Sequence, residues 1–175
     1  MGITRAMKQY SLVDINRFSQ VEFVAALGAI FEATPAIATQ AWYQRPFTSR
    51  QMLYQAMCQV VESRDRSANC QLLQAHPDLG SRVKMAPASV DEQASIGLNM
   101  LTPVEFDRFQ QLNQAYRQRF GFPFIIAVRN HTKASILQQF EARSQNNPEQ
   151  EYTTALAEVM QIAWHRLTDL IIEVS

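Results

Sequence analysis

The stretch from Thr102 to Gly121 reads TPVEFDRFQQLNQAYRQRFG, and it decides the fold class. Thr102 is followed by a proline and, three positions on, by Glu105, which is the pattern of a capping box with proline at the first helical position. Gly121 is a typical helix stop. Between these ends, large side chains recur at helical spacing: Phe106, Phe109, Leu112, Asn113 and Tyr116. The stretch therefore predicts a long amphipathic α-helix.

Similar helix starts are spread along the rest of the chain. They are Ser19 with Glu22, Thr34-Pro35, Thr48 ahead of an apolar face, and Asn147-Pro148. Apolar residues recur at helical intervals from Leu156 to Leu170, so we expect the helix that begins after Asn147 to be the longest. Helices are thus predicted on both sides of the first stretch.

Strand signals are confined to residues 123–128, which read PFIIAV. This apolar run is short, and the chain has no second run to pair with it, so an isolated buried extended segment is favoured over a sheet. The sequence has no internal repeat and no low-complexity linker. We therefore predict an all-α bundle of roughly eight helices with one short buried extended segment, forming a single domain over residues 1–175.

The composition suits one globular domain and argues against several classes of protein. The chain has 175 residues, of which 47% are apolar, and its sixteen basic and sixteen acidic side chains cancel. With no net charge to attract them, neither nucleic acid nor a membrane is expected as a partner. No apolar run is long enough to span a membrane, and Cys58 and Cys70 lack zinc or disulfide spacing. A cytoplasmic protein without a metal is the expectation.

One candidate chemical group is His76, within the sequence His76-Pro77-Asp78-Leu79-Gly80. Pro77 disfavours helical geometry at the residue before it, so we expect His76 at a helix end or on the loop that follows. An imidazole in that place can face a cleft and exchange a proton near neutral pH, with Asp78 available to orient it. The alternative is an ordinary helix exit in which Asp78 satisfies backbone amides.

A second candidate is Glu92, in the sequence Ser89-Val90-Asp91-Glu92-Gln93. The spacing from Ser89 to Glu92 is that of a capping box, so the carboxylate is expected to bond back to the Ser89 amide at the start of a helix. The same rigid position also suits a catalytic carboxylate, and Gln93 beside it offers both donor and acceptor atoms. Cap and catalyst are both compatible with this pattern.

Two further features are compatible with ligand binding. Aromatic residues surround Gly121 and Pro123 ahead of the apolar run, and buried non-helical backbone there leaves amides and carbonyls that need partners. A planar, amide-rich ligand would supply them, although core filling is the ordinary reading. Arg166 lies beside the apolar face of the last helix, where it either extends to solvent, pairs with Asp169, or binds a carboxylate.

These motifs occur together and in one order: His76-Pro77-Asp78-Leu79-Gly80, then Ser89-x-x-Glu92-Gln93, then Asn113-x-x-Tyr116 with Phe120-Gly121-Phe122-Pro123-Phe124. The combination closely resembles the 2-oxo-4-hydroxy-4-carboxy-5-ureidoimidazoline (OHCU) decarboxylase family. The resemblance extends from Phe31-Glu32-x-x-Pro35 to Ile162-x-x-x-Arg166-Leu167 in the last helix.

The resemblance implies an all-helical homodimer, without metal or cofactor, that converts OHCU to (S)-allantoin in uric acid degradation. It also implies a catalytic pair, His76 and Glu92. The residues that it implies for substrate binding are Pro77, Ser89, Gln93, Phe122, Phe124, Ile125, Ile126 and Arg166.

Two other functions compete with this expectation. One is a non-catalytic helical interaction or ligand-binding module, whose motifs would be caps and core. The other is a metal hydrolase that uses His76, His131 and His165; it is disfavoured because no pair of these histidines has His-x-x-x-His spacing.

Overall fold

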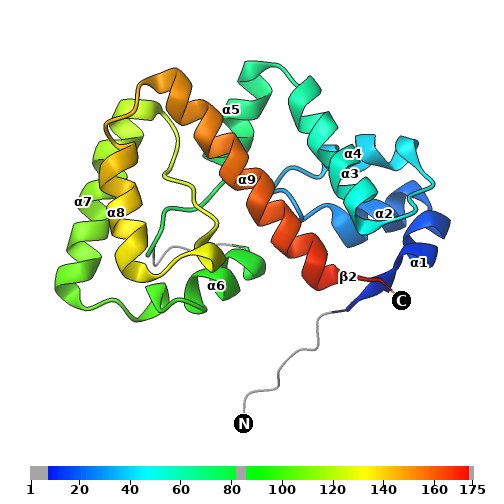
Figure 1. Cartoon of the computed structure of the whole chain (residues 1–175), viewed down its shortest axis with the longest axis horizontal. Coiled ribbons are helices and arrows are strands. Elements are labelled where there is room, and N and C mark those ends of the chain that lie inside the picture. The colour runs from blue at the N-terminus through cyan, green and yellow to red at the C-terminus, as the bar shows by residue number, and fades with distance from the viewer. Residues whose placement is uncertain (1–7, 82–85, 174–175) are drawn as a thin grey trace, which may run out of the picture. The chain divides into compact units, whose positions relative to one another are not determined.

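The computed structural model describes residues 8–81 and 86–173 of the chain (Figure 1). The expected loop after His76 therefore lies partly outside the described residues. The chain forms two compact units: unit 1 contains the residues up to Arg64 and those from Ala163 onward, and unit 2 contains Asp65–Ile162. The last helix contributes residues to both.

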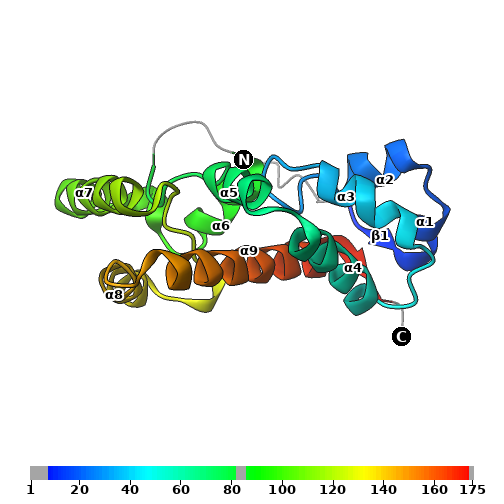
Figure 2. The same cartoon turned by 90° about the horizontal axis from the view of Figure 1, so that it is seen from above.

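Unit 1 contains short helices and a two-stranded parallel sheet. Its elements are β1 (Tyr10–Ser11), α1 (Leu12–Arg17), α2 (Gln20–Leu27), α3 (Ala36–Ala41), η1 (Trp42–Gln44), α4 (Arg50–Ser63), the end of α9 and β2 (Ile171–Ile172). Tyr10 pairs with Ile171 and Ser11 with Ile172. Helices α2 and α3 lie beside each other, and α3 packs on α4 (Figure 2). Fully buried apolar side chains fill the space between them, including Phe23, Leu27, Ile37, Leu53 and Met57.

Unit 2 contains the longer helices. Its elements are α5 (Arg66–Gln74), α6 (Pro87–Ala94), η2 (Leu98–Met100), α7 (Pro103–Phe120), η3 (Val128–Asn130), α8 (Lys133–Arg143) and most of α9 (Pro148–Leu170). Figure 1 shows α7 running next to α8 in that view, and aromatic side chains join the two helices. Phe109 on α7 and Phe140 on α8 hold this pair together, because their rings meet edge to face with centroids 6.5 Å apart.

A buried ionic network lies inside unit 2, next to the aromatic side chains. The Glu151 carboxylate is fully buried and accepts hydrogen bonds from Arg143 through Nε at 2.9 Å and Nη2 at 2.6 Å. Its other donors are the Tyr116 hydroxyl and the Asn146 amide, the latter at 2.7 Å. A buried charge is tolerated only when it is paired and hydrogen-bonded, and Glu151 meets that condition through four bonds.

The predicted helix starts are confirmed in most cases. Ser19 with Glu22 and Thr102 with Glu105 form capping boxes, and Gly121 ends α7 with a φ of 79°. Asn147 accepts a hydrogen bond from the Gln150 amide at the start of α9. Within the described ranges, α9 is the longest helix, with 23 residues.

Two predicted caps are wrong by one position. At the start of α3 the N-cap is Pro35, and the Thr34 hydroxyl donates to the Glu32 carbonyl instead of accepting from the helix. At the start of α4 the N-cap is Ser49, which accepts from the Met52 amide, rather than Thr48. The helices themselves lie where the sequence predicted them.

The all-α class is confirmed, and residues 123–127 are extended, buried and outside any strand. The pairing of β1 with β2 was not predicted, because each strand has only two residues and lacks a periodic pattern. Among the residues that the structure describes, no helix is both long and apolar enough to cross a membrane. The assignment of all 175 residues to a single domain stays a prediction.

Removing the Tyr116 hydroxyl should destabilise the protein. Burial, together with the neighbouring Glu151 carboxylate, raises the pKa of Tyr116, as expected for a phenol that donates to a buried charge. We expect Tyr116→Phe to lower the free energy of unfolding by about 2 kcal/mol, since hydrogen bonds to charged groups contribute roughly that much. Tyr152→Phe, which changes a half-buried ring that stacks with Arg66, is the control. Equal urea midpoints for the two variants would contradict the prediction.

The half-buried pair of Glu105 and Lys133 should make stability depend on acid pH. The hydrogen bond from Lys133, with those from Thr102, lowers the pKa of Glu105 from 4.5 to about 2. A carboxyl whose pKa is depressed on folding adds stability above its unfolded pKa and loses it as the pH falls. We therefore expect Glu105→Gln to be less stable than the wild type at neutral pH, and the gap to close between pH 4.5 and 2 in urea titrations. A gap that persists below pH 2 would refute this origin.

Candidate active site

His76 lies just beyond the end of α5, as its following proline predicts, and it is only 6% exposed. Its ring Nδ1 lies 2.9 Å from the Leu72 carbonyl oxygen, and its backbone N–H donates to the Leu73 carbonyl. A carbonyl only accepts, so Nδ1 must carry a proton. In the neutral ring Nε2 therefore holds the lone pair, which is the arrangement that a general base requires.

The loop after His76 is fixed to α7 by two side chains. The Asp78 carboxylate pairs with Arg117 Nε at 2.8 Å, and the Asn113 amide donates to the Leu79 carbonyl at 2.9 Å. Within the described part of the chain, the Asp78 carboxylate bonds neither to the His76 ring nor to a backbone amide. Both predictions for Asp78, that it orients His76 and that it satisfies backbone amides, are therefore wrong. Its role is to hold the loop against α7.

Glu92 lies in α6, but not as the capping partner of Ser89. The helix begins at Pro87, with Ala86 as N-cap and no side-chain cap, so Ser89 is the third helical residue. The predicted capping box is wrong because Pro87 occupies the first helical position two residues earlier. Ser89, Glu92 and Gln93 are all buried, with exposures of 4%, 9% and 7%.

One hydrogen bond connects the His76 loop to α6. The Gly80 amide donates to Gln93 Oε1 at 2.9 Å, which orients the Gln93 side chain with its acceptor end on the loop. Gly80 has a φ of +66°, and a Cβ at this position would lie 2.7 Å from Leu101 Cδ1. The positive φ is a conformation that glycine adopts without strain, so a larger residue at this position would disturb the loop that bonds to Gln93.

The extended segment between α7 and η3 is buried along its length. Phe122, Phe124, Ile125 and Ile126 are each at most 5% exposed. The Phe124 ring stacks on Phe140 with centroids 4.0 Å apart and meets the Tyr116 ring edge to face. The aromatic residues of this segment therefore fill the core of unit 2, as the ordinary reading of the sequence holds.

The side chains of this segment are closely packed, but several of its backbone amides lack a hydrogen bond to the described protein. Among the residues that the structure describes, no hydrogen bond involves the amides of Phe122, Phe124, Ile125 or Ile126. The Ile125 carbonyl is different, because it accepts from Arg143 Nη1 at 2.8 Å. Buried amides normally have partners, so these amides are compatible with the predicted binding of a ligand by this backbone, which stays a prediction.

Arg166 belongs to unit 1, whereas the other predicted site residues belong to unit 2. It is 7% exposed and pairs with Glu32, itself 5% exposed, through Nη1 to Oε2 at 3.0 Å. The same Nη1 lies 3.3 Å and 3.4 Å from the Ala29 and Ile30 carbonyls. The alternative in which Arg166 extends to solvent is therefore wrong. Its predicted binding of a carboxylate stays a prediction.

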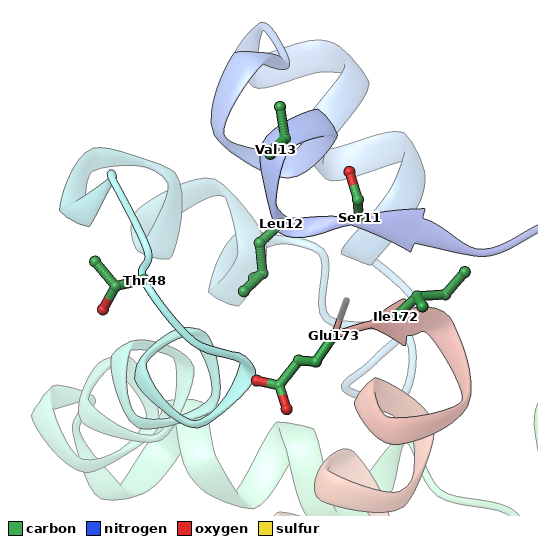
Figure 3. Close-up of a pocket in the computed structure, with 6 residues that line it drawn as sticks. All are labelled: Ser11, Leu12, Val13, Thr48, Ile172 and Glu173. Atoms are coloured by element: carbon green, nitrogen blue, oxygen red, sulfur yellow. The ribbon is translucent and has the colours of Figure 1, made fainter. Parts of the chain in front are cut away.

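A cavity of about 260 Å³ lies in unit 1, and it is lined by Ser11, Leu12, Val13, Thr48, Ile172 and Glu173 (Figure 3). None of the predicted site residues lines it. The one ionisable side chain on its wall is Glu173, whose Oε1 accepts from the Arg50 amide at the first residue of α4, at 2.7 Å. That carboxylate serves to cap a helix, so this cavity offers no acid–base group to a ligand.

The metal hypothesis gains no support from the three histidines. His131 Nδ1 lies 3.3 Å from the Ser135 hydroxyl at the start of α8, and His76 Nδ1 is bonded to the Leu72 carbonyl. No group of three or more His, Cys, Asp or Glu side chains suited to a metal ion occurs within residues 8–81 and 86–173.

Sequence reasoning did not single out the residues that bond the extended segment from outside. These are Arg143, bonded to the Ile125 carbonyl, and Glu158, whose Oε2 accepts from the Ala127 amide at 2.7 Å. A signal was present for Glu151, the partner of Arg143. Glu151, Ala155, Val159 and Ala163 follow one another at intervals of four residues and therefore share one face of the helix. A charged residue on an otherwise apolar face indicates a buried and paired carboxylate.

Comparison with known proteins agrees with the motifs. The family model described as OHCU decarboxylase matches residues 16–168. A 2-oxo-4-hydroxy-4-carboxy-5-ureidoimidazoline decarboxylase from Halalkalicoccus jeotgali is 41% identical over 164 residues, which are 94% of this chain and 93% of that protein. A uric acid degradation bifunctional protein from Bacillus sp. (strain TB-90) is 40% identical over 91% of this chain and 32% of its own length.

A solved structure supports the same assignment. The crystal structure of (S)-allantoin synthase superposes with a TM-score of 0.75 at 32% identity, over 92% of this chain and 54% of that chain. The family model and the relative from Halalkalicoccus jeotgali each cover most of the chain, so the resemblance inferred from the motifs is confirmed. The chain belongs to the OHCU decarboxylase family.

Proposed function

We propose that this protein decarboxylates OHCU to (S)-allantoin in the degradation of uric acid, with His76 and Glu92 as its catalytic pair. The observation that carries the proposal is the bond from the Gly80 amide to Gln93 Oε1. It joins the loop that follows His76 to the helix that bears Ser89, Glu92 and Gln93. Family membership supplies the reaction, and this bond supplies a reason why the motifs act together.

The reaction needs stabilisation of negative charge and then one proton. When the bond between the ring carbon and the carboxylate breaks, carbon dioxide leaves and the electron pair stays on the substrate. The imine and carbonyl groups of the substrate accept that charge best when hydrogen-bond donors surround them. The carbon must finally receive a proton on one face, which makes the product single-handed. A buried acid–base pair meets the last requirement.

His76 and Glu92 suit proton transfer for a structural reason. The Leu72 carbonyl holds the proton on Nδ1, so Nε2 is the basic nitrogen of the neutral ring. We propose that His76 handles the substrate hydroxyl or the reprotonation, and that Glu92 orients it or exchanges a proton with it. The burial of both side chains strengthens their electrostatic effect on a bound substrate.

Substrate binding is assigned to a further set of residues. Gln93 Oε1 accepts from the Gly80 amide, which fixes the side chain next to the His76 loop. We propose that Ser89 and Gln93 fix the ring, that Pro77 shapes the wall beside His76, and that the backbone of Phe122, Phe124, Ile125 and Ile126 bonds the amide groups. Arg166 is proposed to hold an oxygen-rich group of the substrate, because a guanidinium presents planar donors that match a carboxylate.

We further propose that the enzyme works without metal or cofactor, as a homodimer in the cytoplasm, and that it binds neither nucleic acid nor membrane. The balanced charge of the chain supports the last point, since a neutral surface does not attract polyanions over long range. The imine and carbonyl groups of the substrate can themselves take up the electron pair, so the chemistry does not require a separate electron sink.

Replacing either member of the pair should remove the catalysis of this reaction. We expect His76→Ala and Glu92→Gln each to lower the decarboxylation rate by about 10²–10⁴-fold, the usual contribution of a general acid or base. OHCU is generated from urate by the upstream enzymes, and circular dichroism follows the appearance of (S)-allantoin. His131→Ala, which changes a histidine at the start of α8, is the matched control. Racemic allantoin formed by the wild type at the spontaneous rate would refute the proposal and favour a non-catalytic module.

Removal of metal ions should leave the reaction unchanged. The proposed chemistry uses only side chains and substrate groups, so dialysis against a strong chelator is expected to alter neither the rate nor the handedness of the product. Metal analysis of the undialysed protein completes the measurement. Stoichiometric zinc whose removal abolishes activity would overturn the cofactor-free mechanism and favour the metal hydrolase.

A further inference from the structure

The peptide groups on either side of Ile126 are each bonded to a charged side chain. Arg143 Nη1 donates to the Ile125 carbonyl at 2.8 Å, and Glu158 Oε2 accepts from the Ala127 amide at 2.7 Å. Both side chains belong to unit 2, as does the segment. The two bonds lie on neighbouring peptide planes with Ile126 between them.

These bonds determine the direction of the two polar groups of Ile126. Both peptide bonds are trans, because the one cis peptide among the described residues is Arg45-Pro46. In a planar trans peptide the carbonyl and the N–H point in opposite directions. Arg143 bonds to the Ile125 carbonyl, so the Ile126 N–H at the opposite edge of the same peptide group points away from Arg143. Glu158 bonds to the Ala127 N–H, so the Ile126 carbonyl at the opposite edge of the next peptide group points away from Glu158.

Ile126 thus presents one donor and one acceptor, neither of which has a partner among the described residues. A ureido or cyclic amide group carries an N–H next to a carbonyl, which is the complementary pair. We propose that Arg143 and Glu158 are positioning residues that aim the Ile126 amide and carbonyl at such a group of the substrate. This inference rests on the proposed function, and it assigns roles to two residues outside the predicted site.

Arg143 is held rigidly enough for this task. It is 6% exposed, two of its nitrogens bond to the buried Glu151 carboxylate, and its guanidinium lies 4.4 Å from the centre of the Phe124 ring. The third nitrogen, Nη1, is the one that reaches the Ile125 carbonyl. Rotation of Arg143 would break its ion pair with the fully buried Glu151. The ion pair therefore fixes the guanidinium, and the guanidinium fixes the orientation of the Ile125 carbonyl.

Glu158 gives the sharper test, because it is only half-buried and its removal should leave the protein folded. We expect Glu158→Ala to raise KM about tenfold, the equivalent of one well-aligned hydrogen bond, with a much smaller change in kcat. Glu158→Gln keeps an acceptor oxygen for the Ala127 amide and should recover most of the lost affinity. The control is Glu149→Ala, which removes an exposed glutamate of the same helix that pairs with Arg66.

Hydrogen exchange of the Ala127 amide is measured on the same proteins, because it reports the bond without relying on turnover. Faster exchange in Glu158→Ala than in Glu158→Gln, together with the KM pattern, supports the positioning role. An unchanged KM in Glu158→Ala, or equal impairment of the Ala and Gln variants, would overturn it. A wild-type protein that does not accelerate OHCU decarboxylation would instead refute the proposed function, whatever the exchange data show.

Arg143→Lys tests separately the bond from Arg143 to the Ile125 carbonyl. A single ammonium keeps the charge beside Glu151 but lacks the planar fork that serves Glu151 and the Ile125 carbonyl at once. We expect KM to rise by a similar factor and the Ile126 amide to shift in NMR spectra. Wild-type values for both would overturn the assignment of Arg143.

Discussion

The ion pair of Arg143 and Glu151 is the interaction on which unit 2 depends. Glu151 is fully buried and Arg143 nearly so. Glu151 also accepts hydrogen bonds from Tyr116 and Asn146, and Arg143 donates to the Ile125 carbonyl. Removing one member of such a network leaves an uncompensated charge in the core, which is more costly than replacing the whole network with apolar groups. The ion pair therefore fixes the position of Tyr116 in the core and, through Arg143, the Ile125 carbonyl of the extended segment.

Local signals in the sequence identified the helices well. Ser19 with Glu22 and Thr102 with Glu105 were readable because a capping box involves only four consecutive residues and backbone atoms of the same turn. Ser89 with Glu92 shows the same spacing for another reason. Pro87 starts α6 two residues earlier, and residues three apart on a helix are neighbours wherever they lie in it.

The contacts that shape the candidate site could not be read in this way, because they join distant parts of the chain. Arg166 and Glu32 are 134 residues apart in the sequence, and Gly80 and Gln93 are 13 residues apart. The spacing of apolar residues along a helix does not indicate which carboxylate an arginine will pair with in the folded chain. The combination of motifs predicts His76, Glu92 and Gln93, whereas the contacts of Arg143 and Glu158 with the extended segment exist only in the folded chain.

The last helix carries charged residues with separate tasks on one continuous backbone. Glu151 and Glu158 serve the core and the extended segment of unit 2, and Arg166 serves unit 1 through Glu32. An α-helix turns by about 100° per residue, so a single insertion between Glu151 and Glu158 would rotate one of these two side chains away from its partner in unit 2. We therefore expect this part of α9 to tolerate a substitution at an exposed position much better than a change in its length.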